Sequence, residues 1–219
     1  YKKEYLYESV SIQPYSPAAG TGLSSHELNQ PGTYKDVKDT SLTAQFRVIE
    51  NHKSEFLFKA GEGEVFILAW TTTPWTLPAN SALTVGKNIN YVLVKTFNQY
   101  TFEPSNVVLA KALVGKQFGG KFFLAEDETA FANYKAEDKK IPYQILAECK
   151  GEDLVGIRYE QLLPLATPYQ NAADAFRVIA GDFVTTEDGT GIVHTAPTFG
   201  ADDARVAKLA TPEIPPMLI

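Results

Sequence analysis

Hydroxyl-bearing and aromatic residues gather in one short segment, Trp70 to Asn80, which reads Trp-Thr-Thr-Thr-Pro-Trp-Thr-Leu-Pro-Ala-Asn. An apolar run from Val65 to Ala69 precedes it and is typical of a buried strand. Since Pro74 cannot donate a ladder hydrogen bond, we expect this strand to end among the threonine hydroxyls. Threonines are also ordinary strand residues, and on a purely structural interpretation the segment is only a strand end. The two tryptophans and two prolines favour instead a rigid platform that presents hydroxyls and free backbone N–H groups.

A second segment, Asp188 to Asp203, combines a histidine with a pair of carboxylates and reads Asp-Gly-Thr-Gly-Ile-Val-His-Thr-Ala-Pro-Thr-Phe-Gly-Ala-Asp-Asp. His194 follows an apolar pair on an expected strand, where a half-buried core histidine is the alternative to a functional one. Asp202 and Asp203 open an expected helix, and the helix dipole favours acidic residues there with or without a function. A histidine at a strand end, a Pro/Gly loop and paired carboxylates would meet at one rim, which is how loop ends build a pocket.

Signatures of several other kinds of active site are missing from the sequence. It has no Gly-x-Ser-x-Gly, no phosphate loop ending in Gly-Lys-Ser/Thr, and no Gly-x-Gly-x-x-Gly that opens a helix after a strand. We therefore expect neither ATP nor dinucleotide binding by this chain. His26, His52 and His194 share no metal-ligand spacing, so no metal site is expected. A single cysteine, Cys149, cannot form an internal disulfide, which fits a reducing compartment.

Composition and charge narrow the class of protein further. The 219 residues include 20 Lys plus Arg and 26 Asp plus Glu, for a formal net charge of −6. This balance excludes a generic basic nucleic-acid binder. The longest apolar run, Val65 to Trp70, is far shorter than the ~20 residues of a membrane-spanning helix. Tyr1 to Glu4 lacks an initiator Met and an apolar stretch, so we expect a piece of a longer chain rather than a secretory signal.

Short β-rich runs dominate the chain, so we predict a mainly β fold with peripheral helices (α+β) and a β-barrel-like or sandwich core. Helices are expected over Val107 to Phe118 and Asp202 to Ala210, and the polar residues 125–142 are expected to form a loop or short helix. Asp188-Gly189 favours a tight hairpin turn. Too few long amphipathic helices are present for a doubly wound α/β fold. The expected strands are 43–49, 55–59, 65–70, 82–85, 91–96, 143–150, 176–180, 183–186 and 192–195.

Together, the two segments resemble the editing domain that is inserted in the catalytic body of isoleucyl-tRNA synthetases, a family of class I aminoacyl-tRNA synthetases. Trp70 to Asn80 is similar to one of the family's two editing signatures. Gly189 to Asp203 is similar to the other, Gly-Thr-Gly-x-Val-His-Thr-Ala-Pro followed by Gly-x-Asp-Asp. Valyl and leucyl enzymes typically carry an arginine and an acidic residue around the proline, whereas Thr73 to Asn80 looks like the isoleucyl version. Gly151 to Gly156 adds weaker support, as a turn of the family's Gly-x-x-Leu-x-Gly type.

The resemblance implies a division of the chain into three parts. Residues 1–40 would be a connector from the synthetase catalytic body, residues 41–210 the editing domain, and residues 211–219 an exit linker. The nucleotide-binding signatures of the catalytic body are absent, so the chain is expected to edit but not to activate amino acids. The implied partners are the 3′ end of tRNA(Ile) carrying valine and the rest of the synthetase, but no membrane. The implied location is cytoplasmic, and no cofactor is implied for editing, since only the absent catalytic body uses ATP and Mg.

The implied activity is post-transfer editing, the hydrolysis of the ester of mischarged valyl-tRNA(Ile). Valine lacks one methylene of isoleucine, and a hydrophobic pocket separates such a pair by only ~1–3 kcal/mol, a magnitude established on enzymes of this very family. A second, smaller pocket that admits valine and hydrolyses its ester multiplies the two selections. We expect attack of an oriented water on the ester carbonyl, because no residue is an obvious nucleophile.

The family's pattern also implies a role for each site residue. Asn80 would support the threonine loop by hydrogen bonding, and His194 would form the wall that leaves no room for isoleucine. Asp203 would pair with the substrate's α-ammonium and so fix where the carbonyl lies relative to water. The full set is Thr72 and Asp203 as catalytic residues, and Trp70, Thr71, Thr73, Asn80 and His194 as substrate-binding residues.

One loop departs from the family's pattern. Thr198 to Ala201 lacks the glycine that often follows Ala-Pro, and an alanine stands just before the Asp pair, which leaves the loop's shape open. Two other interpretations also stay open. The chain is a β-rich module that binds tRNA or a protein partner without chemistry, or it is an editing domain of the valyl or leucyl type.

Overall fold

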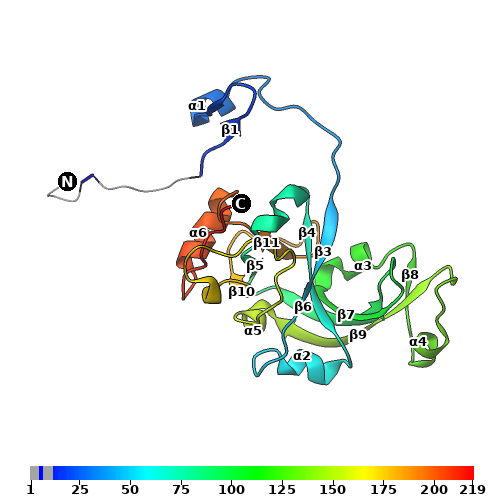
Figure 1. Ribbon diagram of the computed structural model, residues 1–219. Helices are drawn as coiled ribbons and strands as arrows, with labels where there is room; N and C mark the ends of the chain where they lie inside the picture. The colour runs from blue at the N-terminus through cyan, green and yellow to red at the C-terminus, as the bar shows by residue number, and fades with distance from the viewer. Residues whose placement is uncertain (1–4, 7–11) are drawn as a thin grey trace.

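Strand β6 (Asn90–Phe97) lies inside the larger of the two sheets that form the core, and its alternating side chains face opposite sides of that sheet. Tyr91 and Leu93 belong to one buried cluster of the core, whereas Val92 and Val94 belong to another, as the two-residue period of a strand requires. Both faces of this strand are therefore covered. The computed structural model describes residues 5–6 and 12–219 (Figure 1).

Six strands form the larger sheet, in the order β3-β4-β7-β6-β9-β8. The pairs β4–β7 and β8–β9 are parallel, and the other neighbours are antiparallel. Strand β4 ends at the first threonine of the Thr-rich segment. The bounds of the other strands are β3 Leu42–Arg47, β4 Val65–Thr71, β7 Pro104–Ala110, β8 Phe122–Leu124 and β9 Ile141–Lys150.

Three strands form the smaller sheet, with β5 (Ala82–Val85) in the middle. It is parallel to β10 (Arg177–Ala180) and antiparallel to β11 (Ile192–Thr195). Every residue of β5 is buried. Leu83, together with residues of β4 and β6, belongs to the largest hydrophobic cluster, which therefore joins the two sheets into one core.

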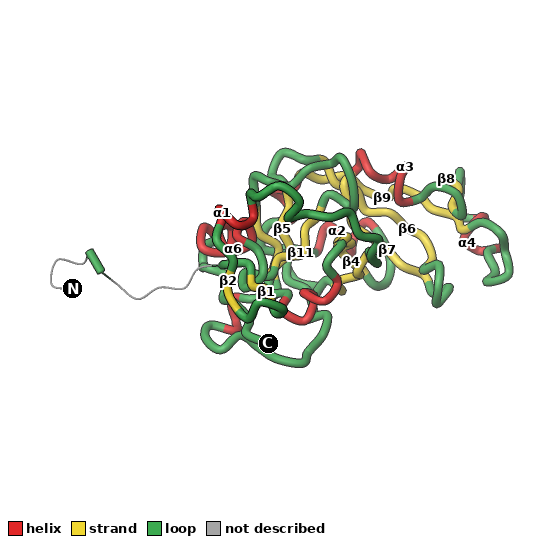
Figure 2. Tube along the Cα trace, turned by 90° about the horizontal axis from the view of Figure 1, so that it is seen from above, coloured by secondary structure: helices red, strands yellow, loops and turns green. Residues whose placement is uncertain are grey.

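Short helices surround the two sheets. In Figure 2, α6 lies near the small sheet at one end of the molecule, and α4 and β8 lie at the other end. A two-stranded hairpin and α1 precede β3. The remaining elements are β1 Tyr15–Ser16, β2 Thr21–Gly22, α1 Ser25–Leu28, α2 Glu55–Ala60, η1 Pro74–Ala79, η2 Lys111–Leu113, α3 Val114–Gln117, α4 Thr129–Asn133, α5 Gly151–Leu154, η3 Ala172–Asp174 and α6 Ala201–Leu209.

The predicted class, mainly β with peripheral helices, is confirmed, and the strands at 82–85 and 192–195 have the predicted bounds. No closed barrel is formed by the described residues, because the six-stranded and three-stranded sheets stay separate. No helix in this part of the chain is long and apolar enough to cross a membrane.

Two predicted elements are wrong, and a third is correct only in part. Residues 55–59 form helix α2 rather than a strand, and an ion pair between Lys59 and Glu55, one turn apart, stabilises it. The prediction failed because five residues are too few for their hydrophobic periodicity to separate helix from strand. Of the helix predicted over Val107 to Phe118, residues 107–110 belong instead to strand β7, whose continuous apolar run reflects burial on both faces, whereas residues 111–117 are helical in η2 and α3. Residues 183–186 form no strand and no hairpin, because β11 pairs with β5 instead.

The predicted connector and exit linker flank the domain at its two ends. Within residues 1–40, the structure describes 5–6 and 12–40, so Tyr1 to Glu4 lies outside the described residues. Residues 211–219 follow α6, and Ile214 and Met217 in this segment are buried in hydrophobic clusters. The segment therefore packs onto the domain at least as far as Met217.

Candidate functional site

The two segments that carry the candidate functional side chains meet because β5 pairs with β11. Helix η1 leads from the end of β4 into β5, so the threonine segment lies beside β11. The register places His194 opposite Leu83, and the backbone N–H of Ser81 donates to the carbonyl of Thr195. A short loop after β11 leads into α6, whose first turn carries Asp203. Strand pairing thus joins residues more than a hundred positions apart.

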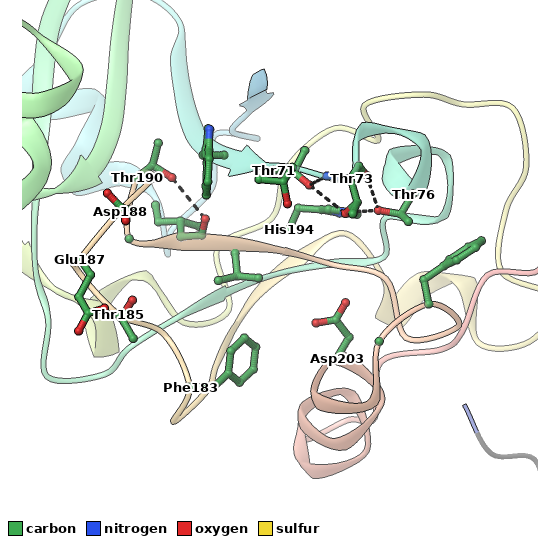
Figure 3. Close-up of a pocket in the computed structure, with 18 of the residues that line it drawn as sticks. Thr71, Thr73, Thr76, Phe183, Thr185, Glu187, Asp188, Thr190, His194 and Asp203 are labelled. Atoms are coloured by element: carbon green, nitrogen blue, oxygen red, sulfur yellow. Dashed lines mark hydrogen bonds between the residues drawn. The ribbon is translucent and has the colours of Figure 1, made fainter. Parts of the chain in front are cut away.

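A cavity of about 590 Å³ lies between these elements (Figure 3). One wall comes from the end of β4 and from η1, the second from residues 183–194, and the third from the start of α6. Six of the seven residues expected from the sequence line it, namely Trp70, Thr71, Thr72, Thr73, His194 and Asp203. Asn80, the seventh, is only 2% exposed and lies behind the wall.

The three consecutive threonines differ in the use of their hydroxyls. The backbone N–H of Thr73 donates to Thr71 Oγ1 over 3.0 Å, and the two hydroxyls are 3.3 Å apart. Thr71 is buried, whereas Thr72 is exposed on the cavity wall. No hydrogen bond within the described part of the chain involves the Thr72 hydroxyl, so it is available to a ligand. The first and third threonines therefore fix the loop, and the second presents a free hydroxyl.

A chain of buried hydrogen bonds holds the neutral His194 ring in one tautomer. Asn80 Nδ2, which can only donate, lies 3.1 Å from His194 Nδ1, so Nδ1 accepts and the ring proton is on Nε2. That Nε2–H donates to Thr76 Oγ1 over 2.8 Å, and the Thr76 hydroxyl in turn donates to the carbonyl of Thr73 over 2.8 Å. Asn80 Oδ1 accepts from the hydroxyl of Tyr159.

This environment excludes His194 as a general base. Burial lowers the pKa of the imidazole to about 4, so the ring is neutral near pH 7. A second ring proton would also face the Asn80 amide donor. Both ring nitrogens of His194 are used within the protein, and only ring carbons remain to face the cavity. The residue is therefore a rigid, uncharged part of the wall.

The lowered pKa of His194 predicts a specific loss of stability in acid. His194 binds a proton near pH 6.5 in the unfolded state and only near pH 4 in the folded state. The stability that the neutral ring contributes is therefore fully present above pH 6.5 and is lost as the pH falls from 6.5 toward 4. We expect the free energy of unfolding to fall by about 2 kcal/mol more between pH 7 and pH 5 in the parent chain than in His194→Gln. Urea unfolding at both pH values measures the difference. Equal pH dependence of the two proteins would contradict the assignment.

Asp203 supplies a partly desolvated carboxylate to the cavity. Its Oδ2 accepts a hydrogen bond from the backbone N–H of Ala196 over 3.1 Å, and burial raises the pKa of the carboxyl group. A Cβ at Gly200 would lie 2.9 Å from Asp203 Oδ2, so glycine leaves the room that the carboxylate occupies. In Figure 3 the carboxylate points from α6 toward the side of the cavity where Thr71 and Thr73 lie.

Its neighbour Asp202 faces away from the cavity. It forms an exposed ion pair with Arg205 at 3.3 Å and does not line the cavity wall. Of the two acidic residues that open α6, one therefore serves the exposed helix surface and the other the cavity.

The charge of the cavity is one-sided. Asp203, Glu187 and Asp188 line it, and none of the lining residues in the described part of the chain is Lys or Arg. Asp188 is balanced by Lys116, 3.0 Å away at the exposed rim. An environment of this sign favours a bound cation such as an ammonium group and disfavours a phosphate.

Several lining residues were not singled out from the sequence. Thr76 was detectable in principle, because it lies three positions after Thr73, which is one turn of a 3-10 helix. Residues 183–190 were expected to be a strand and hairpin, so their place in the wall had no local signal. The missed residues outside the two segments are Phe183, Thr185 and Glu187, whereas Thr76, Asp188 and Thr190 lie within the segments but were given no role.

Comparison with known proteins of similar sequence shows the family of this chain. An isoleucine–tRNA ligase of Cytophaga hutchinsonii is 64% identical over 210 residues, which cover 96% of this chain. The enzyme of Bacteroides fragilis is 59% identical over 217 residues, and that of Clostridium tetani 44% over 208. The chain belongs to the isoleucyl-tRNA synthetase family. It spans 18% of the length of the first two of these synthetases. No protein-family model matches the chain.

Solved structures show which fold this segment of an isoleucyl-tRNA synthetase has. The crystal structure of GlLeuRS-CP1 matches with a TM-score of 0.53 at 16% identity, covering 77% of this chain and 59% of that one. The cytosolic leucyl-tRNA synthetase editing domain of P. knowlesi matches with a TM-score of 0.52 at 15% identity, covering 75% of this chain and 60% of that one. At such low identity the likeness shows the fold alone, which this chain shares with that leucyl-tRNA synthetase editing domain.

Proposed function

We propose that this chain is a post-transfer editing domain that hydrolyses the ester of valyl-tRNA(Ile). One observation carries the proposal: the threonine loop and Asp203 line a single cavity that contains carboxylates but no Lys or Arg among the described residues. An aminoacyl ester at the 3′ end of tRNA brings an α-ammonium group and a terminal ribose without a 3′ phosphate. The charge of the cavity fits that ligand.

Asp203 anchors the substrate. A partly buried carboxylate gains a charge-assisted hydrogen bond when an α-ammonium group approaches, and the same contact offsets part of the cost of its desolvation. An anchored amine fixes the position of the adjacent carbonyl carbon, since the two are separated by a single Cα. Orientation of this kind supplies much of the rate of a hydrolysis that has no protein nucleophile.

The threonine loop holds the other half of the ester. Thr71 and Thr73 keep the loop in shape through their mutual hydrogen bonds, and the free hydroxyl of Thr72 binds the ester or the terminal ribose. Water then attacks the carbonyl carbon, the ester C–O bond to the ribose breaks, and a proton from the water ends on the leaving ribose oxygen. Because both nitrogens of His194 are occupied within the protein, the water is activated by orientation, with help from the neighbouring ribose hydroxyl.

His194 sets the size limit. Its neutral ring is fixed by two side chains, so the wall does not yield to the extra methylene of isoleucine. Trp70 lines the opening and, at 36% exposed, offers an aromatic surface to the terminal adenosine. Asn80 supports the wall from behind without touching the substrate.

In the full-length synthetase, this domain would act after the catalytic body has charged tRNA(Ile) with the use of ATP and Mg. Editing itself would need no cofactor. The partners would be the 3′ end of the tRNA and the rest of the synthetase chain, in the cytoplasm.

Release of free amino acid from charged tRNA(Ile) tests the proposal. We expect the chain to release valine from valyl-tRNA(Ile) much faster than isoleucine from isoleucyl-tRNA(Ile). Threonyl and leucyl esters are tested beside them as further substrates. Binding of the charged tRNA without release of valine would mean that the domain is a binding module. Faster release from the threonyl or leucyl ester would assign it to another editing type.

A further inference from the structure

A fully buried tyrosine lies behind the wall of the cavity. Tyr159 is 1% exposed, and its ring packs edge-on against Phe46 with 5.2 Å between ring centroids. The Tyr159 hydroxyl donates to Asn80 Oδ1 over 2.7 Å. Tyr159 does not line the cavity, so its hydroxyl influences the site only through Asn80.

The Asn80 side chain is held at both ends. Its Nδ2 donates to the carbonyl of Ala82 over 2.9 Å and to His194 Nδ1 over 3.1 Å, while Oδ1 accepts from Tyr159. With both N–H groups used and the oxygen paired, a rotation of the amide would break several buried hydrogen bonds at once. The N–H that is aimed at the His194 ring therefore has a fixed direction.

We propose that Tyr159 is a positioning residue for the editing cavity: through Asn80, its hydroxyl holds the His194 ring in the Nε2–H tautomer and in the orientation that limits the size of the substrate side chain. The size-limiting part of this inference rests on the proposed function. The tautomer part rests on the hydrogen bonds alone, so the two parts can be tested separately.

Tyr159→Phe is the sharpest variant, because it keeps the packed ring and removes only the hydroxyl. Asn80 Oδ1 would then be a buried acceptor without its partner, which is costly. A rotation that seeks a new partner for Oδ1 takes Nδ2 away from His194 Nδ1. The imidazole then exchanges between its two tautomers and samples more than one orientation.

Nitrogen chemical shifts of His194, measured by NMR on the 219-residue chain, test the tautomer directly. In the parent chain we expect a protonated Nε2 and an unprotonated Nδ1, and in Tyr159→Phe we expect averaged shifts from both tautomers. A parent protein with the proton on Nδ1 would overturn the inference without any variant. Unchanged His194 shifts in Tyr159→Phe would overturn it as well.

Hydrolysis rates test the consequence for selectivity. We expect the ratio of the valyl-tRNA rate to the isoleucyl-tRNA rate to fall about five- to tenfold in Tyr159→Phe, the effect of one hydrogen bond. Tyr134→Phe is the matched control, because the buried Tyr134 hydroxyl has no hydrogen-bond partner among the described residues, and its ring packs on Phe97, outside the cavity. That control should keep the ratio and the His194 shifts.

The outcomes separate this inference from the proposed function. A lower melting temperature of Tyr159→Phe with an unchanged rate ratio would mean that the hydroxyl is only structural, and the inference would be wrong. A parent chain that hydrolyses neither ester would refute the proposed function, and with it the selectivity part. The NMR result would still decide whether Tyr159 controls His194.

Discussion

Asp203→Asn is expected to slow the hydrolysis of valyl-tRNA by about 10- to 100-fold, the effect of losing a charge-assisted hydrogen bond worth about 1.5–3 kcal/mol. Asparagine has nearly the shape of aspartate and can still accept from the Ala196 N–H, so the loop keeps its geometry. Only the negative charge that would hold the α-ammonium group is removed. Single-turnover deacylation of valyl-tRNA measures the effect.

The stability of Asp203→Asn should not fall with its activity. Burial raises the pKa of Asp203, so the folded state binds a proton more readily than the unfolded state, and stability falls as pH rises from the unfolded-state pKa through the folded-state pKa. At pH 7 the charged carboxylate thus costs stability, and Asp203→Asn should unfold at the same or a higher urea concentration.

Asp202→Asn is the matched control for this prediction. It removes the neighbouring carboxylate, which is 69% exposed and pairs with Arg205 outside the cavity, and should leave hydrolysis within about twofold. Loss of activity in Asp203→Asn through unfolding, or an equal loss in both variants, would contradict the anchoring role.

His194→Ala is expected to change which esters are hydrolysed. Without the ring, the wall recedes, and the discrimination that one methylene allows, about 10- to 200-fold, should largely disappear. Hydrolysis of isoleucyl-tRNA should therefore rise toward the rate of valyl-tRNA. Parallel deacylation of the two charged tRNAs, with exposed His52→Ala as control, measures this change.

The competing view of His194 makes a different prediction. If the imidazole were the general base, both esters would be hydrolysed more slowly in His194→Ala and their ratio would be preserved. The occupied ring nitrogens of His194 and its pKa of about 4 favour a role in the cavity wall over a role as general base. Continued rejection of isoleucine by His194→Ala would show that other residues set the size limit.

Local patterns were enough to predict the parts of the fold that depend on short-range chemistry. The apolar run before Pro74 gave the end of β4, and the acidic first turn after Gly200 gave the start of α6. Strand β7 escaped prediction because a strand buried on both faces loses the alternation that marks it. Helix α2 was too short for its periodicity to be recognised.

The site was predictable as a set of residues but not as a network. Six of the seven expected residues line one cavity, and the resemblance to a family was needed to select Asp203 over Asp202. The roles of Thr76 and Tyr159 depend on contacts with residues at distant positions, such as the 2.7 Å bond from Tyr159 to Asn80. The contact of Thr76 with His194 is fixed by the pairing of β5 with β11, whereas Tyr159 is placed by its bridge to Val48 and its backbone hydrogen bond to Phe176. No local pattern encodes either arrangement.

The most direct test of this account is a crystal structure of the chain with a non-hydrolysable valyl-adenosine mimic. We predict the mimic in the 590 Å³ cavity, with its ammonium group on Asp203, its carbonyl and ribose beside Thr72, and its isopropyl group against the ring carbons of His194. A mimic whose amine lies away from Asp203, or which binds outside this cavity, would contradict the claim that these two distant segments form one editing site.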